Sequence, residues 1–184
     1  DDSRGDVVVV LHQLGNHGPS YFKRYADQFR RFVPDCRSAD LGSCSRQEII
    51  NAYDNAVLST DDFLAQTIQM LAADASHDTA MIYISDHGES LGEANVYLHG
   101  LPYVIAPDTQ IKVPLISWLS SGMVESNGID ESCVKERAHK PASHDNLFHS
   151  VLGLMQIKTS AYDPGQDLFA GCLQPVSGGR DEAA

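Results

Sequence analysis

The sequence predicts an α/β fold with a mainly parallel sheet. Residues 7–11 and 79–84 are short apolar runs rich in β-branched and aliphatic side chains, which is typical of strands buried on both faces. Residues 46–73 lie between them and carry apolar side chains near helical spacing. A strand, a long helix and a second strand in this order indicate a crossover connection, which joins parallel strands of one sheet.

Composition sets the class of protein. The 184 residues carry a formal net charge of -12, which opposes nucleic acid or an anionic membrane surface as a partner because both need basic patches. No apolar run approaches the roughly 18–20 residues needed to span a bilayer. There is no initiator Met and no signal-type segment, so we expect a processed or excised piece. We expect it to fold as a single domain over residues 1–184, monomeric and without a membrane domain.

The first half of the chain contains two predicted helices. Aromatic side chains recur at helical spacing over residues 21–32, which predicts a short helix with these rings in the core. A loop follows, and Ser45 and Glu48 then match a capping box, in which each side chain bonds the other residue's amide. The long helix that they open is expected to end near Ala73.

Later elements are shorter. Residues 112–119 read as a third strand, placed at an edge or a strand start by Pro114. Residues 91–108 are expected to be irregular and residues 122–141 to form a polar loop. A last helix is capped by Ser143 or Asp145 and runs through Met155, and the end of the chain is expected to fray.

The four cysteines indicate an oxidising compartment. Their number is even, and Cys36 and Cys44 lie eight residues apart in a polar loop. We expect these two to form a disulfide, which leaves Cys133 and Cys172 to pair. A zinc ribbon is disfavoured because no Cys-x-x-Cys pair is present.

Two histidine-containing loops follow the two predicted strands. Asp86 and His87 come directly after residues 79–84, with Gly88 next, and Asp oxygen with His nitrogen is a ligand mixture typical of zinc. The tripeptide alone also fits a solvated turn. His12 and His17 come after residues 7–11, in a loop limited by glycine and proline. Two strands that each deliver histidine and glycine at their ends predict two walls of one site.

The sequence resembles the lipid A phosphoethanolamine transferases, the group that includes the mobile colistin-resistance enzymes. Residues 85–103 carry the resemblance most specifically, and they read SDHGESLGEANVYLHGLPY. It continues through residues 11–21, 53–56, 113–118 and 145–148 and through the loop of Cys36 and Cys44. The family has the alkaline phosphatase and sulfatase fold, so the resemblance implies a partial sandwich with a parallel sheet between helices.

The resemblance also implies an activity and a place. Family members carry membrane helices first and then a catalytic domain on the periplasmic face of the bacterial inner membrane. They transfer phosphoethanolamine from phosphatidylethanolamine to lipid A through a covalent threonine intermediate, which confers resistance to polymyxins such as colistin. By match to the motif, Asp86 and His87 would be ligands of Zn²⁺. His17 and His99 would line the same catalytic and substrate-binding site, holding the phosphoryl group or a second zinc.

The chain departs from the family pattern in one respect. The family's nucleophilic threonine and a metal-binding glutamate come before the strand that corresponds to residues 7–11, so neither is present here. The resemblance therefore implies that residues 1–184 are a truncated catalytic domain. Ser85 and Ser90 flank the motif as weaker nucleophile candidates. Glu89 is a candidate hydrogen-bond partner for a ligand histidine. Four other histidines, His12, His139, His144 and His149, fit structural or surface positions at least as well as the site.

Three functions remain open at this point. The first is the zinc-dependent transferase, with this chain inactive alone because it lacks the nucleophile. The second is a phosphatase or sulfatase of the same fold, against which the element around His99 and the paired cysteines argue. The third is a non-catalytic fragment that keeps part of a metal and head-group site.

Overall fold

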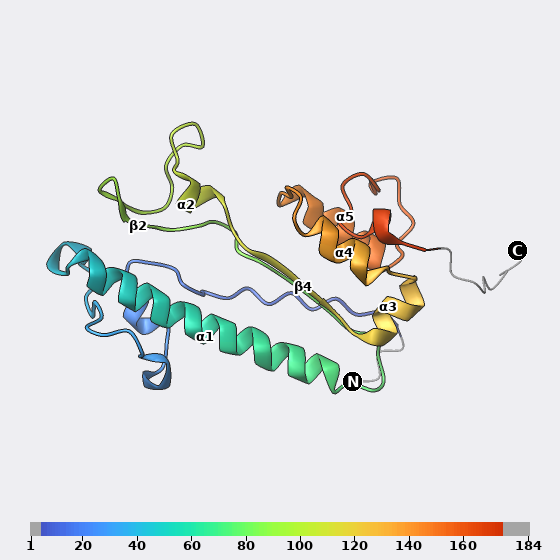
Figure 1. Ribbon diagram of the computed structural model, residues 1–184, viewed down its shortest axis with the longest axis horizontal. Helices are drawn as coiled ribbons and strands as arrows, with labels where there is room; N and C mark the ends of the chain where they lie inside the picture. Colours follow the sequence, from blue (N-terminus) through green and yellow to red (C-terminus); the bar gives the residue numbers. More distant parts are fainter. Residues whose placement is uncertain (1–4, 175–184) are drawn as a thin grey trace, which may run out of the picture. The chain divides into compact units, whose positions relative to one another are not determined.

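The computed structural model describes residues 5–174 (Figure 1). These residues form two compact units, each assembled from separate stretches of the chain. Unit 1 comprises residues 5–8, 71–82 and 116–174, and unit 2 comprises residues 9–70 and 83–115. Whether they act as one catalytic domain, as expected from the sequence, stays a prediction. Within the described residues, no helix is both long and apolar enough to cross a membrane.

Unit 2 contains helix α1 (Arg46–Ala72) as far as Met70. The helix begins with the predicted capping box, because Ser45 N donates to Glu48 Oε2 (2.7 Å) and Glu48 N donates to Ser45 Oγ (3.3 Å). Its buried residues Ile49 and Ala52 join Tyr21 and Cys36 in the core of this unit. The predicted disulfide between Cys36 and Cys44 is confirmed and lies beside that core.

The predicted helix over residues 21–32 is wrong. Two short 3-10 turns stand there instead, η1 (Tyr21–Lys23) and η2 (Asp27–Phe29). The buried side chain of Asn55 explains the difference, since its Oδ1 accepts from both Arg31 N (2.8 Å) and Phe32 N (2.9 Å). A side chain that satisfies these amides removes the need for a helical ladder. A third turn of the same kind, η3 (Leu41–Ser43), follows before Cys44.

The described strands form two small sheets. Strand β1 (Ala80–Ile84) pairs with β4 (Leu115–Leu119), and β2 (Ser90–Glu93) pairs with β3 (Val96–Leu98). The second pair is antiparallel, with Ser90 opposite Leu98. The first is antiparallel as well, because the residue after β1 bonds the residue before β4 and Ser120 N donates to Thr79 O. The fold is α/β as predicted, but these pairs do not supply its expected parallel strands.

Residues 7–11 are not the buried strand that the sequence predicts. They belong to no strand among the described residues, and their side chains are 53–85% exposed. A run of aliphatic residues becomes a central strand only where other strands flank it on both sides. No strand within the described residues takes either place.

Helices dominate the C-terminal part of unit 1. Its helices are α3 (Ser121–Asn127), α4 (Glu131–Arg137) and α5 (Asp145–Leu154). The polar loop predicted over residues 122–141 is therefore wrong, and its helix-start signals are Ser120, which accepts from Met123 N, and Asp130, which accepts from Cys133 N. The predicted second disulfide is confirmed, joining Cys133 in α4 to Cys172 in the turn η4 (Ala170–Cys172).

Candidate metal centre

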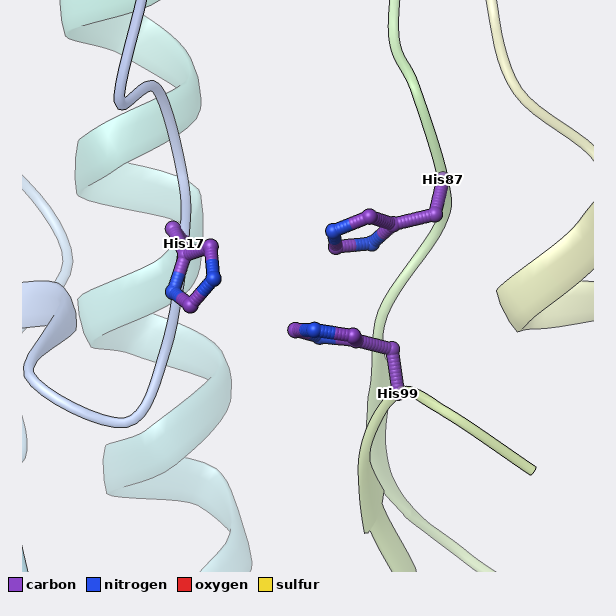
Figure 2. A group of neighbouring side chains, drawn as sticks. All are labelled: His17, His87 and His99. Atoms are coloured by element: carbon purple, nitrogen blue, oxygen red, sulfur yellow. The ribbon is translucent and has the colours of Figure 1, made fainter.

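Three histidines of unit 2 converge on one point. His17, His87 and His99 each have a ring nitrogen within 4.8 Å of those of the other two. The rings of His87 and His99 are stacked with centroids 3.8 Å apart, while His17 meets the ring of His99 edge-on at 5.1 Å (Figure 2). Of the residues that the sequence placed in the site, these are the ones the structure brings closest together.

Each histidine stands on a backbone turn that its neighbours enforce. His87 follows β1, and the next residue must be glycine because a Cβ on Gly88 would lie 2.0 Å from Thr109 O. His99 follows β3 and is held between Leu98 and Gly100, both with positive φ. His17 closes a turn in which its N–H donates to Leu14 O (3.1 Å). The glycines in these motifs therefore set where the imidazoles point.

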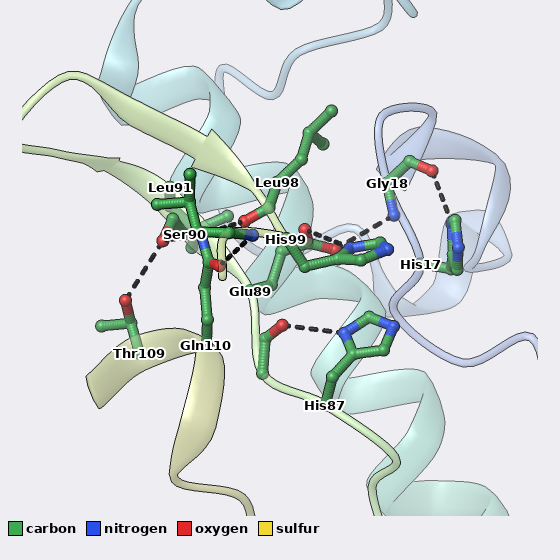
Figure 3. A network of polar contacts seen from close by, with 12 residues as sticks. His17, Gly18, His87, Glu89, Ser90, Leu91, Leu98, His99, Thr109 and Gln110 are labelled. Atoms are coloured by element: carbon green, nitrogen blue, oxygen red, sulfur yellow. Dashed lines mark hydrogen bonds and ion pairs between the residues drawn. The ribbon is translucent and has the colours of Figure 1, made fainter. Parts of the chain in front are cut away.

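Hydrogen bonds select one tautomer for all three rings. The Nδ1 atom of His17 lies 2.7 Å from Gly18 O, and that of His87 lies 2.8 Å from Gly88 O. The Nδ1 atom of His99 lies 3.0 Å from Glu89 Oε1 (Figure 3). Carbonyl and carboxylate oxygens only accept, so Nδ1 carries the proton in each ring. Each Nε2 atom is left available, so that it can bind a metal ion through its lone pair or, when it is protonated, donate to a phosphoryl oxygen.

Glu89 ties two of the histidine loops together. Its side chain is only 4% exposed, and while Oε1 accepts from His99, Oε2 accepts from Gly18 N at 3.3 Å. This is the outer-sphere carboxylate that the sequence suggested for a ligand histidine. Its two oxygens fix the orientation of His99 and the position of the backbone next to His17.

Gln110 completes the hydrogen-bond network around His87 and His99, and its role was not predicted from the sequence. Helix α2 (Asp108–Ile111) presents its buried side chain, which donates to Ser90 Oγ (2.9 Å) and to Leu98 O (3.0 Å) (Figure 3). Gln110 O also accepts from Gly88 N (3.0 Å), so one residue braces the backbone beside both His87 and His99. A lone glutamine at the start of a new helix gives no sequence signal for such a role.

Asp86 lies at the edge of the cluster. Its side chain is 77% exposed, and Oδ1 accepts from His87 N (3.0 Å) and lies 3.8 Å from His87 Nε2. It is outside the group of three mutually close ligands, yet its carboxylate oxygen is near the ring nitrogen that the tautomer leaves free. Its role as a metal ligand stays a prediction.

The two serines of the motif are engaged elsewhere. Ser90 is fully buried, and its Oγ contacts Thr109 Oγ1 and Gln110 Nε2. Ser85 Oγ donates to His87 O (2.7 Å). The Ser85 hydroxyl thus bonds the backbone of the site, and the Ser90 hydroxyl joins two side chains of the network around it.

The other histidines lie outside the cluster. His12 is exposed, and His149 belongs to α5, where its Nδ1 accepts from Asp163 N (3.0 Å). His144 lies directly before α5, and His139 follows α4. This agrees with the structural positions that the sequence favoured for them.

Two tyrosines interact electrostatically with Glu89, the buried Tyr21 and the partly buried Tyr53. Burial raises the pKa of Tyr21 well above its usual value, and the Glu89 carboxylate adds to the rise. Burial and the same carboxylate also raise the pKa of Tyr53, whose ring meets that of Tyr21 edge-on. Both phenols are neutral at physiological pH, so the negative charge of Glu89 is left to favour a positively charged partner on the histidine side.

The arrangement suits a zinc ion. Imidazole nitrogen and carboxylate oxygen, which His87 and Asp86 offer side by side, are common protein ligands of zinc, and a catalytic zinc keeps a position for substrate. Nitrogen donors with a nearby carboxylate disfavour magnesium and calcium, which take oxygen ligands. The residues present therefore fit the metal that the sequence predicts.

Comparison with known proteins decides the family. The model of the sulfatase family matches residues 1–157. The chain belongs to the sulfatase family. Within this family it is similar to phosphoethanolamine transferase EptA of Salmonella typhimurium, with 44% identity over 94% of this chain and 32% of the relative. It is also similar to phosphatidylethanolamine transferase Mcr-2 of Escherichia coli, with 55% identity over 83% of this chain and 27% of the relative.

The sulfatase-family fold is confirmed by solved structures. Lipooligosaccharide phosphoethanolamine transferase A of Neisseria meningitidis, solved as a soluble domain and as an integral membrane protein, has 40% identity and a TM-score of 0.87 in both cases. The match covers 90% of this chain, 50% of the soluble domain and 31% of the membrane protein. The chain thus spans about a third of the length of the curated relatives it matches.

Proposed function

We propose that this chain is part of a zinc-dependent enzyme that transfers phosphoethanolamine from phosphatidylethanolamine to lipid A. The convergence of His17, His87 and His99, with Nε2 free in each, is the observation that carries the proposal. The sulfatase-family relatives are named as phosphoethanolamine or phosphatidylethanolamine transferases, which favours this transfer over phosphatase or sulfatase chemistry. The reading as a non-catalytic fragment remains the alternative for the chain in isolation.

The site residues divide into two proposed roles. His87 and Asp86 would hold Zn²⁺, which supplies Lewis-acid stabilisation of the charge that develops on phosphoryl oxygens. His99 stacks on His87, and His17 meets both rings edge-on. These two histidines would orient the phosphoryl group by donating from a protonated Nε2, or hold a second zinc through its lone pair. A protonated Nε2 on either ring can also donate to the departing alkoxide.

We infer that the chain alone does not complete the transfer. A two-step mechanism needs a hydroxyl at the metal to carry the covalent intermediate. The Ser85 hydroxyl bonds His87 O, the Ser90 hydroxyl bonds the side chains of Thr109 and Gln110, and no threonine stands in the family's context. The nucleophile and a further metal ligand would come from the part of the enzyme that the relatives have and this chain does not match.

The proposed location is the periplasmic face of the bacterial inner membrane. The Neisseria relative is named an integral membrane protein, and two disulfides fit an oxidising compartment. Lipid A and phosphatidylethanolamine would both be available there. Adding an ethanolamine cation to lipid A lowers the negative charge that attracts polymyxins, which is the proposed link to colistin resistance.

Zinc binding tests the metal site directly. We expect calorimetry to show zinc binding to this chain, with His87→Ala and Asp86→Ala each weakening it about tenfold or more. The matched control is His149→Ala, which changes a histidine of α5 outside the cluster and should bind zinc as the parent does. Parent-like affinity in the His87→Ala and Asp86→Ala double variant would exclude the assignment.

A chimera tests the activity. The matched segment of Mcr-2 is replaced by this chain, and release of the head group is followed with a fluorescent phosphatidylethanolamine analogue. We expect turnover by the chimera, none by this chain alone, and steep losses on His17→Ala, His87→Ala or His99→Ala. Full activity of an Asp86→Ala chimera would remove the proposed role of Asp86 in binding the metal.

A further inference from the structure

A hollow of about 380 Å³ lies on unit 2, and none of the three cluster histidines His17, His87 and His99 lines it. Its lining comes from the loop before His17, from turn η1 and the residue after it, and from the middle of α1. The lining residues used below are Gln13, Leu14, Lys23, Arg24, Thr60 and Phe63. None of them is used in the proposed zinc site.

The hollow carries two cations in a strongly acidic chain. Lys23 and Arg24 both line it, whereas the formal net charge of the sequence is -12. In the part of the chain that the structure describes, neither forms an ion pair with a carboxylate, while Arg30 and Arg37 nearby are both paired with Asp35. Two adjacent cations without carboxylate partners attract an anion from outside the protein.

Arg24 connects this hollow to the metal centre. Its Nε donates to His17 O at 2.9 Å, so the guanidinium is fixed on the backbone of a residue whose ring belongs to the cluster. A guanidinium held through Nε still presents its two terminal nitrogens, which match the spacing of two phosphate oxygens. An anion bound by this guanidinium would be held by the same side chain that bonds the backbone of His17.

The rest of the lining is amphipathic. Gln13 and Thr60 offer an amide and a hydroxyl, and Thr60 Oγ1 donates to Asn16 Oδ1 (2.9 Å), which leaves its oxygen free to accept. Leu14 and Phe63 are 61% and 38% exposed and supply apolar surface at the same place. Cations, hydroxyl-binding groups and apolar surface together are complementary to a phosphorylated sugar that carries acyl chains.

We propose that this hollow binds the sugar phosphate of the acceptor lipid, with Arg24 and Lys23 holding the phosphate monoester. The inference rests on the proposed transferase function, to which it adds the acceptor site. It places the receiving phosphate beside His17, next to the group that would hold the donor's phosphoryl.

The test uses the chain itself and a soluble probe, N-acetylglucosamine 1-phosphate. Titration of the zinc-free, ¹⁵N-labelled chain is followed by NMR, with the Arg24 Nε–H and the amides of Gly15 and Lys23 as reporters. We expect saturable shifts at these groups, and a dissociation constant about tenfold weaker in both Arg24→Gln and Lys23→Gln. Arg24→Lys keeps the charge without the fork and should give an intermediate affinity.

The matched control is Arg31→Gln, which removes the same charge from an exposed arginine outside the hollow and should bind as the parent does. Lys23 is exposed, so its variant tests the cation without disturbing the His17 loop that Arg24 supports. Equal weakening in Arg31→Gln, or shifts confined to the rings of His17, His87 and His99, would overturn the inference. Parent-like probe affinity with His87→Ala separates this site from the zinc site, whose own test is metal binding.

Discussion

At the scale of single residues, Glu89 couples the two halves of the histidine cluster. It accepts from His99 and from Gly18 N through different oxygens and is almost fully buried. Removing its charge while keeping its shape should loosen both contacts, because an amide offers only one accepting oxygen. We expect Glu89→Gln to weaken zinc binding about 10- to 100-fold, measured by calorimetry at neutral pH.

Glu93→Gln is the control for that experiment. Glu93 lies in the same hairpin and is paired at the surface with Arg46, whose terminal nitrogen is 3.3 Å from its Oε1. Its variant changes the net charge equally and leaves the histidines alone. If both variants lowered zinc affinity to the same degree, Glu89 would act only through the overall charge.

Some residues of the histidine site could be identified from the sequence and others could not. His17, His87 and His99 could be chosen because each stands beside glycine at the end of a predicted element. Glu89 could be suggested because it adjoins the motif. Gln110 and Arg24 could not be chosen from the sequence. Their roles depend on hydrogen bonds to the backbone oxygens of Leu98 and His17, which only the fold brings near them.

At the scale of elements, the loop between Phe29 and α1 depends on one buried carboxylate. Asp35 accepts from Arg30 Nη2 (2.6 Å), Arg30 Nε (2.8 Å) and Tyr25 Oη (2.6 Å), and its side chain is fully buried. Burial alone would raise the pKa of Asp35, but the bonds from Arg30 and Tyr25 outweigh it and hold that pKa below its usual value. The folded state therefore favours the ionised form.

This gives a pH dependence of known sign. A depressed pKa means that the contribution of Asp35 to the free energy of unfolding is fully present above the unfolded value of about 3.9 and is lost as pH falls below it. We expect Asp35→Asn to destabilise the chain by about 1–3 kcal/mol at pH 7 in urea unfolding, and by less at pH 3. The control Asp27→Asn, an exposed carboxylate of η2, should change little at either pH.

Elements whose start and periodicity are set by residues close together in the sequence could be predicted, and α1 is the example. The capping box at Ser45 and the apolar periodicity after it gave α1 almost to the residue. The helix predicted over residues 21–32 failed because Asn55, far along the chain, bonds the amides that a helix would have used. Ser120 and Asp130 are recognisable as helix caps in the sequence. The helices that they begin, α3 and α4, are too short to show a clear apolar periodicity, so they were not predicted.

At the scale of the whole molecule, the family could be recognised from the sequence because its motif residues are those of the site. The antiparallel pairing of β1 with β4 could not, since strand direction is set by which segments meet and not by their composition. The same holds for residues 7–11, whose apolar pattern predicts burial, whereas no described strand flanks them and they are exposed.

That exposed run has a consequence for the chain in solution. Five consecutive aliphatic residues, extended and 53–85% exposed, without a charge or proline among them, make an open template for stacking of identical chains. We expect the purified chain to form fibrils that bind thioflavin T at high concentration. Val9→Lys should delay this several-fold, whereas Met70→Lys, an equally apolar and exposed position on α1, should not. Unchanged kinetics in Val9→Lys would assign the fibrils to another segment.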